Sequence, residues 1–566
     1  MDRQPPRTTS NEIDLYIRTY YSLLRSSGDV RVRGFEEAHL YSASSLHAGA
    51  LAPEPDLAAF AYSAARLPAC FHHVRRMVLG QSIAQLTRAG FPVETWASVR
   101  TRGRRRPLRW DGGSTLAVFV ASASDIDDLV PIVTAYQIEW NKLHLRLAGS
   151  GLDPASLPGL DDVTLSGALG TDADGVRVLR AALGGSWAEG LAAIAAGELD
   201  LTIRLLDGSF REYQRSAKTW WDAIQEARPE LMRRPVYFVS SNTHSLANLL
   251  GGYAFAHQEA IAGFLRTTNP EGLGQRIDDA LARNDELVVP NLLYYGLRLY
   301  MTAAPGGQRV AEVQAHDARV GITTIESPAR IDVAAQVFEL ARLDPRHMDP
   351  RLRVPGLEQL ARSNAVIVNI DYPLGMAAYH HLAAVTSGLD EIRGMYIMGK
   401  AATLNARVGD VMISKAVHDE HSGNTYLLRN ALHARDVQPL MKYGTVLDNQ
   451  KALTVRSAFL QNRSYMDVFY REGYTVMEME AGPYLSAIHE TAAPQRHPKG
   501  EIVNLADGVA FDLGLVHYAS DTPYSRRQSL LSKSMSFFGM ESTYACALAI
   551  ARRILRLEIE RAGTIT

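Results

Sequence analysis

Near the end of the chain, residues 474–484 read YTVMEMEAGPY. The alternation over Tyr474–Glu478 predicts a strand, and the apolar period over Gly482–His489 predicts a helix that follows at once. Glu478 and Glu480 therefore fall at the C-terminal end of a strand. In an open parallel sheet, the ligand crevice lies outside this end of the strands.

Three other segments place a glycine or a carboxylate where a predicted strand ends. They are residues 369–375 (NIDYPLG), residues 398–414 (MGKAATLNARVGDVMIS) and residues 517–521 (HYASD). Glycine lets the backbone approach a ligand closely, and a carboxylate can bind hydroxyl groups or transfer a proton. Together the four segments predict a ligand site at the carboxyl ends of several strands.

The composition narrows the class of protein. The chain has 566 residues, of which 46% are apolar and 21% are charged, and its net charge is −2. This balance argues against a protein that coats nucleic acid and against an acidic disordered protein. Cys70 and Cys546 cannot by themselves form a disulfide framework or a structural zinc site. Because no signal-peptide core and no run of about 18 apolar residues is present, we expect a soluble, cytoplasmic protein without a membrane partner.

The pattern of elements changes near residue 230. Residues 1–11 are expected to form a disordered lead, and residues 12–230 a mainly helical α/β domain of unknown role. Residues 231–566 alternate strands with helices, which is typical of a largely parallel sheet with covered faces.

Individual elements follow from the same periodicities. The apolar period predicts helices that include residues 71–86, 176–227 and 333–341. Short runs rich in β-branched residues predict strands at 115–121 and 235–241.

The four segments occur in an order that resembles the nucleoside phosphorylase/nucleosidase superfamily, which includes purine nucleoside phosphorylase, methylthioadenosine nucleosidase and AMP nucleosidase. Met477–Ala481 resembles the family's Val-Glu-Met-Glu-Ala signature, and Ser520-Asp521 resembles its Ser-Asp pair. Gly399–Leu404, followed by residues 408–411, resembles its Gly-x-Ala-Gly-x-Leu…Val-Gly-Asp-Val segment. The resemblance covers roughly residues 365–525. For residues 231–566 it implies a catalytic domain of three layers with a mostly parallel central sheet, and it implies a homo-oligomer.

The resemblance also implies roles for individual residues. Cleavage of an N-glycosidic bond develops positive charge on the ribose and negative charge on the leaving base. Glu480 would accept hydrogen bonds from the ribose hydroxyls with Met479 packed beside the sugar, and Asp521 would protonate or hydrogen-bond the base, for example a purine. The remaining substrate-binding candidates of these motifs are Glu478, Gly399, Lys400 and Ser520.

Two departures from the family pattern favour hydrolysis over phosphorolysis. Ala401-Ala402 replaces the family's Ala-Gly pair, and 371–375 (DYPLG) replaces the Ser/Thr-Gly-Ile-Gly turn that contacts ribose and, in phosphorylases, phosphate. No Gly-plus-Arg phosphate loop is evident. We therefore expect a nucleoside or nucleotide N-glycosidase without a cofactor, and phosphate enters as co-substrate only if the protein is a phosphorylase.

The base that would activate a water molecule is not part of the four segments. Asp371 is the first candidate because it stands at a strand end, and Glu326 is a remote second. Residues 240–245 (SSNTHS) open a helix after the strand at 235–241, so Ser240 and Asn242 are candidates for binding phosphate or a nucleotide 5′-phosphate. A helix cap is the alternative function of that loop.

Simpler structural explanations remain for each residue. Glu480 alone could be a helix first-turn acid, Ser520-Asp521 an N-cap, and Asp371 a turn former before Pro373. A second class of function is also open, in which the same pocket binds a nucleoside-like ligand as a sensor without catalysis.

Two other features have simpler explanations than a part in the chemistry. Residues 100–109 contain six arginines, which suits a solvated loop or subunit contact better than contact with nucleic acid or a phosphorylated ligand. The adjacent His72 and His73 should point apart, which argues against a zinc site.

Overall fold

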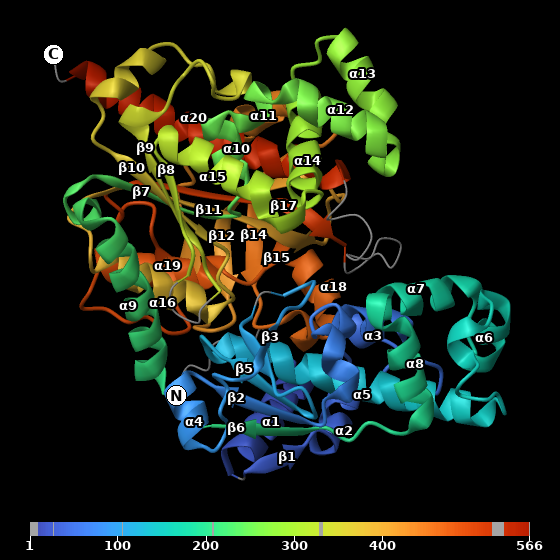
Figure 1. Cartoon of the computed structure of the whole chain (residues 1–566). Coiled ribbons are helices and arrows are strands. Elements are labelled where there is room, and N and C mark those ends of the chain that lie inside the picture. Colours follow the sequence, from blue (N-terminus) through green and yellow to red (C-terminus); the bar gives the residue numbers. More distant parts are fainter. Residues whose placement is uncertain are drawn as a thin grey trace.

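The computed structural model describes residues 10–26, 28–104, 106–206, 209–327, 332–522 and 537–564. The chain forms two separate sheets, one of six strands and one of eleven (Figure 1). The predicted disordered lead lies outside the described residues as far as residue 9, and the first helix begins at Asn11. No helix within the described ranges is long and apolar enough to cross a membrane.

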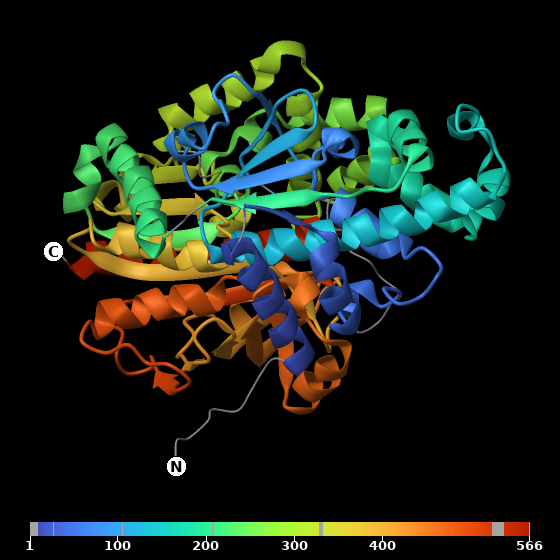
Figure 2. The ribbon, with the colours of Figure 1, turned by 90° about the horizontal axis from the view of Figure 1, so that it is seen from below.

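The smaller sheet lies in the N-terminal unit, residues 10–206. Its strand order is β1 (Asp29–Arg31), β6 (Thr202–Leu205), β2 (Arg76–Gly80), β5 (Thr115–Phe119), β4 (Leu108–Trp110) and β3 (Ala97–Val99). The helices around it are α1 (Asn11–Ser26), α2 (Arg33–Tyr41), α3 (Leu57–Ala64), α4 (Ile83–Arg88), α5 (Ala123–Gly149), α6 (Asp162–Leu169), α7 (Ala173–Leu183) and α8 (Trp187–Ala196). Figure 2 shows α5 lying lengthwise along this sheet.

The long helix α5 starts directly after β5 because Asp125 caps its first turn. The Asp125 side chain accepts hydrogen bonds from the backbone N–H groups of Ala121 at 2.7 Å and Ser122 at 3.2 Å. Ile126, Leu129 and other residues of α5 are buried in one cluster with strands β2 and β5. The predicted strand at 115–121 is therefore confirmed as β5.

Two predicted helices of this unit are wrong in part. Residues 76–80 form β2 within the predicted helix 71–86, and residues 202–205 form β6 within the predicted helix 176–227. β2 pairs in parallel with both β5 and β6, so it is central to the sheet and Met77–Gly80 is buried throughout. A strand buried on both faces has no polar alternation, and its apolar run cannot be distinguished from a helix by periodicity.

The larger sheet lies in the C-terminal unit, residues 209–564. Its strand order is β16 (Ile502–Asn504), β13 (Thr425–Leu427), β12 (Val411–Asp419), β14 (Val446–Thr454), β15 (Tyr474–Glu478), β11 (Ile392–Thr403), β7 (Val236–Ser241), β10 (Val366–Asp371), β9 (Ala335–Glu339) and β8 (Ile322–Ile325). β17 (Asp512–Asp521) pairs with β11 and β12.

This sheet is mixed, whereas a mostly parallel one was expected. β7 is parallel to β10 and β11, and β11 is parallel to β17. β9 and β15 are antiparallel to their neighbours β10 and β11. The carboxyl ends of the parallel strands β7, β10, β11 and β17 therefore meet at one edge of the sheet.

Helices cover both faces of the large sheet (Figure 1). α9 (Phe210–Ala227), α16 (Met376–Thr386) and α19 (Ala481–Ala492) pack on one face, and α10 (Ser245–Gly251), α14 (Val289–Thr302) and α20 (Met540–Thr564) pack on the other. The remaining helices are α11 (Tyr253–Ala256), α12 (Gln258–Thr268), α13 (Leu273–Ala282), α15 (Gln308–Arg319), α17 (Ala434–Val437) and α18 (Arg463–Arg471). The C-terminal unit is thus a three-layer α/β arrangement.

The predicted helix at residues 333–341 is wrong, because residues 335–339 form β9. Val337 packs in the cluster under α9 and α16, whereas Phe338 packs in the cluster under α10 and α20. Alternate residues of β9 therefore enter opposite cores, and the absence of an exposed face removed the alternation that would have indicated a strand.

Candidate active site

The two units meet at the turn that follows β10. Gly375 in this turn has φ +52°, and a Cβ on it would lie 2.3 Å from Ser124 Oγ of α5. Ser124 Oγ accepts a hydrogen bond from the backbone N–H of Met376 at 2.9 Å, and so caps the first turn of α16 from the other unit. This contact places α5 of the N-terminal unit against the carboxyl end of β10.

Glu480 lies at the junction of β15 and α19, as the sequence predicted. The backbone N–H of Gly375, in the turn after β10, lies close enough to the Glu480 carboxyl group to favour its ionised form. Burial raises the pKa of Glu480 to about 7, although the positive charges of Arg104 and Lys400 oppose the rise. A carboxyl group in this state can exchange a proton near neutral pH.

Glu478 supports this junction through contacts within the protein. Its Oε2 accepts hydrogen bonds from the backbone N–H groups of Glu480 at 2.7 Å and Ala481 at 2.6 Å, and Thr454 Oγ1 donates to its Oε1. Burial and the neighbouring Glu480 raise the pKa of Glu478 to about 8. Both oxygens are engaged, so the structure shows Glu478 bracing the turn that holds Glu480.

Asp521 is the last residue of β17 and is 8% exposed. Burial raises its pKa to about 6, while the Thr522 backbone N–H and the charges of Arg66 and Lys400 favour the ionised form. Lys400 thus acts on both Asp521 and Glu480. The structure brings these three residues together from β11, from the end of β17 and from the turn after β15.

The neighbouring motif residues make contacts within the protein. Ser520 Oγ donates to the carbonyl oxygen of Ala401 at 3.4 Å. Gly399 faces the His517 ring, since a Cβ on it would lie 3.3 Å from His517 Cδ2. Burial lowers the pKa of His517 to about 4, so this histidine is neutral. The place of Gly399 in the motif is accounted for by close packing of strands β11 and β17.

Met479 and Asp371 are contributed by two different strand ends. Met479 lies between the two glutamates, and its carbonyl oxygen would lie 3.7 Å from a Cβ on Gly375. Asp371 ends β10 and is 5% exposed, and its Oδ1 accepts a local hydrogen bond from the Tyr372 backbone N–H at 3.0 Å. Its position at the shared strand edge agrees with the prediction.

The loop at residues 240–245 is engaged in core and cap contacts. Ser240 Oγ accepts from the Tyr484 hydroxyl at 2.8 Å. Asn242 Oδ1 accepts from the backbone N–H groups of His244 at 3.1 Å and Ser245 at 2.7 Å, and so caps α10. This geometry is that of the helix cap given above as the alternative.

Two arginines of the N-terminal unit reach the carboxylates, and the sequence analysis missed both. Arg104 binds Asp128 of α5 with two hydrogen bonds, at 2.7 and 3.0 Å. Burial by itself would lower the pKa of Arg104. The negative charge of Asp128 outweighs this effect of burial, and Glu480 acts in the same direction as Asp128, so the pKa of Arg104 is raised.

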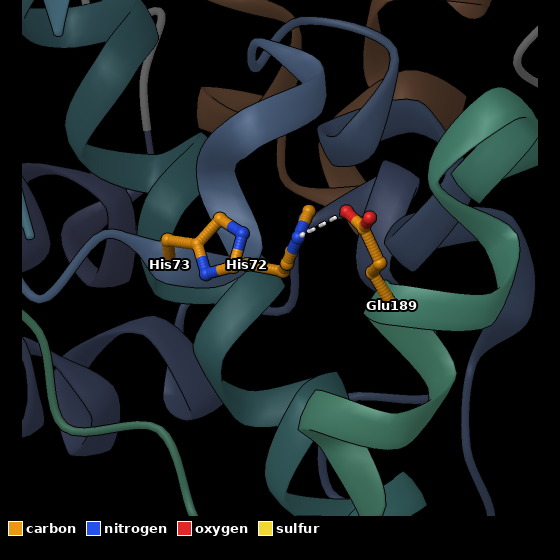
Figure 3. A group of neighbouring side chains, drawn as sticks. All are labelled: His72, His73 and Glu189. Carbon is orange, nitrogen blue, oxygen red and sulfur yellow. Dashed lines mark ion pairs between the residues drawn. The ribbon is translucent and has the colours of Figure 1, made fainter. Parts of the chain in front are cut away.

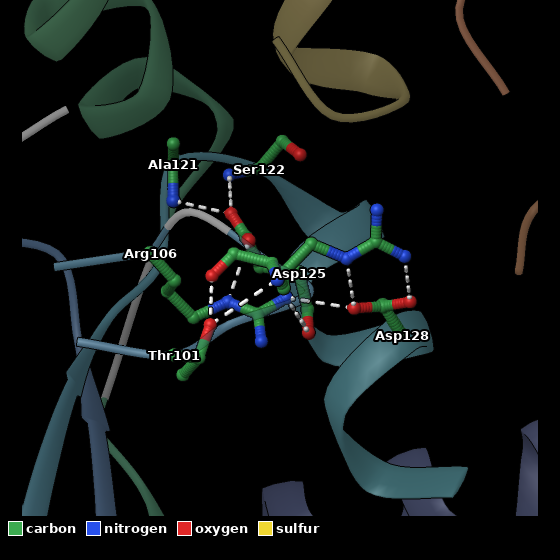
Figure 4. A network of polar contacts seen from close by, with 7 residues as sticks. Thr101, Arg106, Ala121, Ser122, Asp125 and Asp128 are labelled. Atoms are coloured by element: carbon green, nitrogen blue, oxygen red, sulfur yellow. Dashed lines mark hydrogen bonds and ion pairs between the residues drawn. The ribbon is translucent and has the colours of Figure 1, made fainter. Parts of the chain in front are cut away.

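A buried ion-pair network holds Arg104 in place. Arg106 donates to Asp128 at 3.1 Å and to Asp125 at 2.9 Å, and Arg106 and Asp128 are almost fully buried (Figure 4). The prediction of a solvated loop over residues 100–109 is therefore wrong for Arg104 and Arg106. The signal in the sequence was the spacing of Asp125 and Asp128, which places two carboxylates on one face of α5 opposite the arginine-rich loop.

Arg66, on the turn after α3, carries an incompletely bound guanidinium. Its Cζ lies 3.3 Å from the centroid of the Tyr62 ring, and its Nη1 donates to the Tyr62 carbonyl oxygen at 2.9 Å. Among the residues that the structure describes, its buried Nε has no hydrogen-bond partner. Burial lowers the pKa of Arg66, and Asp521 is one of the charges that oppose this change. Arg66, Arg104 and Lys400 therefore place positive charge beside the two carboxylates, and Asp128 offsets part of it.

One group of side chains in the described part of the chain has the spacing of metal ligands, and it lies in the N-terminal unit (Figure 3). The ligand atoms of His72, His73 and Glu189 all lie within 4.8 Å of one another. His72 Nδ1 contacts the Ala69 carbonyl oxygen at 2.9 Å, and its Nε2 lies 3.5 Å from Glu189. The expectation that the two histidines point apart is wrong, because their ring centroids are 4.0 Å apart on a 3-10 turn.

Comparisons with known proteins give a family and weak structural similarities. A family model described as "Family of unknown function (DUF6909)" matches residues 32–556. No curated protein sequence matches the chain. The structure is similar to uridine phosphorylase from Schistosoma mansoni in complex with thymine, with 11% identity and a TM-score of 0.31 over 59% of this chain and 92% of that chain. It is also similar to a methylthioadenosine phosphorylase from an antarctic soil metagenomic library, with 8% identity and a TM-score of 0.27 over 35% of this chain and 73% of that chain.

Proposed function

The chain belongs to the family of unknown function DUF6909, and we propose that it is an N-ribosyl hydrolase that cleaves the bond between base and ribose in a nucleoside or nucleotide. The observation that carries this proposal is the pair of carboxyl groups Glu480 and Asp521, both with raised pKa and both facing the charge of Lys400. The sequence resemblance in the same segments supports it.

The two carboxyl groups suit the two ends of the scissile bond. Asp521, with a pKa of about 6, retains a proton in roughly a tenth of molecules at pH 7, far more than an ordinary aspartate with a pKa near 3.9. It can therefore donate a proton to the departing base nitrogen as the C1′–N bond breaks. Glu480 would accept hydrogen bonds from the 2′- and 3′-hydroxyls, and its negative charge would favour the cation that develops on the ribose.

Water completes the reaction in this proposal. Its oxygen bonds to C1′, the electron pair of the C1′–N bond leaves with the base, and one water proton passes to a general base. Asp371 is the candidate for that base because it ends β10 at the strand edge where Asp521 ends β17. The products are ribose, or ribose phosphate, and the free base.

A second candidate is phosphorolysis, and Arg66 is the observation that favours it. A guanidinium with an unpartnered buried Nε, near Arg104 and Lys400, is suited to an anion such as inorganic phosphate. The same cations also suit the 5′-phosphate of a nucleotide substrate of the hydrolase. A non-catalytic sensor for such ligands is the third candidate.

A release assay tests the proposal. Purified protein is incubated with purine and pyrimidine nucleosides and their 5′-monophosphates, with and without inorganic phosphate, and free base is measured by chromatography. We expect release without phosphate. Release only with phosphate would identify a phosphorylase, and no release combined with thermal stabilisation by one of the compounds would favour the sensor.

A further inference from the structure

A large cavity lies at the opposite end of the C-terminal unit from the candidate active site. Its volume is about 490 Å³, and we call it the arginine cavity because five arginines line it: Arg429, Arg435, Arg552, Arg553 and Arg556. Asp512, the first residue of β17, is in its wall, whereas Asp521, the last residue, is in the candidate active site. Ten residues of strand separate the two sites by about 30 Å.

The carboxylates of the arginine cavity are already bound. Asp512 accepts two hydrogen bonds from Arg553, at 2.7 and 3.0 Å, and a third from the Tyr396 hydroxyl at 2.6 Å. Asp436 accepts from the backbone N–H of His433 at 2.9 Å, as part of a helix cap. Asp512 is therefore paired with Arg553, and Asp436 is the other acid among the described lining residues, against four further arginines.

Four arginines of the cavity are left without a carboxylate. Arg552 Nε donates to the carbonyl oxygen of Arg351 at 2.6 Å, which supplies no negative charge. Within the part of the chain that the structure describes, no carboxylate oxygen lies within 4.0 Å of a charged nitrogen of Arg429, Arg435, Arg552 or Arg556. The cavity wall therefore has an excess of positive charge.

Two of these arginines are held close together by α20. Arg552 and Arg556 are one helical turn apart, so both side chains reach the same face. Burial lowers the pKa of Arg552, and the charge of Arg556 lowers it further. Like charges gathered around a cavity without a counterion are destabilising, and a bound anion would remove that cost.

We propose that the arginine cavity binds a phosphorylated ligand of nucleotide size. Guanidinium groups match phosphate oxygens with paired hydrogen bonds. The volume of about 490 Å³ is far more than a bare phosphate fills, and it falls in the usual range for small-molecule sites, roughly 300–1,000 Å³. Leu432, Val509 and Phe511 form an apolar part of the wall, which suits the base of a nucleotide.

Calorimetric titration of the full-length protein with ADP tests the proposal, and adenosine and inorganic phosphate serve as comparison probes. All titrations use an Asp521→Asn background so that the probe stays intact. We expect ADP to bind more tightly than either comparison probe, and its affinity to fall as salt rises. Binding of ADP no tighter than inorganic phosphate would contradict the proposed ligand size.

Variants locate the binding. Arg435→Ala with Arg556→Ala, both at exposed positions, should weaken ADP binding at least tenfold, and Arg435→Lys with Arg556→Lys should weaken it less because the charge remains. Arg211→Ala with Arg319→Ala removes two exposed arginines elsewhere and should leave the affinity unchanged. Thermal unfolding checks that each variant is folded.

Hydrogen exchange separates this cavity from the candidate active site. ADP should slow amide exchange over residues 429–436 and 505–513, two segments that contribute most of their residues to the cavity wall. Protection confined to residues 478–482 and 519–522, or equal ADP affinity in the Arg435/Arg556 variant and its control, would overturn the proposal. None of these outcomes depends on whether the protein cleaves nucleosides.

Discussion

Ser124 Oγ accepts a hydrogen bond from the backbone N–H of Met376 across 252 residues of sequence. The donor belongs to the turn that also presents the Gly375 N–H to Glu480. One contact between the units therefore helps to fix the carboxylate that we assign to the ribose.

We predict that Gly375→Ala impairs both stability and activity. The φ of +52° disfavours any side chain, and the new Cβ would collide with Ser124 Oγ at 2.3 Å. A loss of about 1–3 kcal/mol is expected from such strain, and thermal unfolding measures it. Gly263→Ala, in α12 with no atom within 4 Å of the new Cβ, is the control and should be neutral or stabilising. Equal behaviour of the two variants would contradict the tight approach at Gly375.

Asp521→Asn should lower kcat by about 100-fold or more, because the amide cannot protonate the leaving base. In the wild type, the rate should follow a bell-shaped pH profile with its maximum between 6 and 7, because the reaction needs Asp521 protonated, with a pKa of about 6, and Glu480 ionised, with a pKa of about 7. Initial rates of base release between pH 5 and 8 measure both effects. The control is Asp390→Asn, an exposed aspartate of the same unit. A folded Asp521→Asn protein with wild-type turnover would rule out the assigned role.

The same substitution should stabilise the protein at neutral and higher pH. The pKa of Asp521 is raised from 3.8 to about 6 on folding. The contribution of Asp521 to the free energy of unfolding is therefore fully present below about pH 4 and is lost as pH rises through 6. Ionising it in the folded state costs roughly 2–3 kcal/mol, and asparagine avoids this cost. Urea unfolding at pH 5 and pH 8 should show a larger gain for Asp521→Asn at pH 8. A gain independent of pH would contradict the raised pKa.

The two glutamates of the motif should respond differently to the same change. Glu480→Gln removes the charge assigned to the ribose, and we expect a higher KM and a lower kcat. Glu478 has a pKa of about 8 and is largely neutral at pH 7, so glutamine at position 478 can retain its backbone hydrogen bonds with little loss of activity. Steady-state kinetics on both variants decide the point. Equal losses of activity in the two variants would indicate that both glutamates only support the structure.

Arg66→Ala should affect substrates according to their charge. Loss of the guanidinium beside Asp521 should raise KM at least tenfold for a nucleotide, or for phosphate in a phosphorylase, and should leave KM for an uncharged nucleoside nearly unchanged. Arg66→Lys keeps the charge and should recover part of the loss. Kinetics with a matched nucleoside and nucleotide provide the comparison, and a uniform loss for both would show that Arg66 only supports the fold.

The positions of the carboxylates at strand ends were predicted from the sequence more accurately than the strands and helices around them. Tyr474–Glu478 is the strand β15 with the predicted bounds, and Asp521 and Asp371 end strands as expected. These segments combine strand patterns with a change of residue type at the strand end, which is a local signal. β9 carried no such signal because both of its faces are buried.

The position of the cations beside Glu480 and Asp521 could not be predicted from local patterns. Arg66 and Arg104 precede Glu480 by several hundred residues, and only tertiary folding brings them to it. Six arginines in ten residues suggested solvation, yet Arg106 and Asp128 are almost entirely buried together. Arginines that pair with carboxylates of another element can be buried, although an arginine-rich segment is expected to be exposed from its composition alone.

The residues of the candidate active site come from both units, which matters for a gene that is divided between them. Arg66, Arg104 and Ser124 lie before the passage from β6 to α9, and Lys400, Glu480 and Asp521 lie after it. A gene cut at this passage would separate Arg66 and Arg104 from the two acids and would leave Glu480 and Asp521 with Lys400 alone of the three cations. Exchange of one half for that of a distant relative would therefore disturb the charge balance of the site unless the other half changed with it.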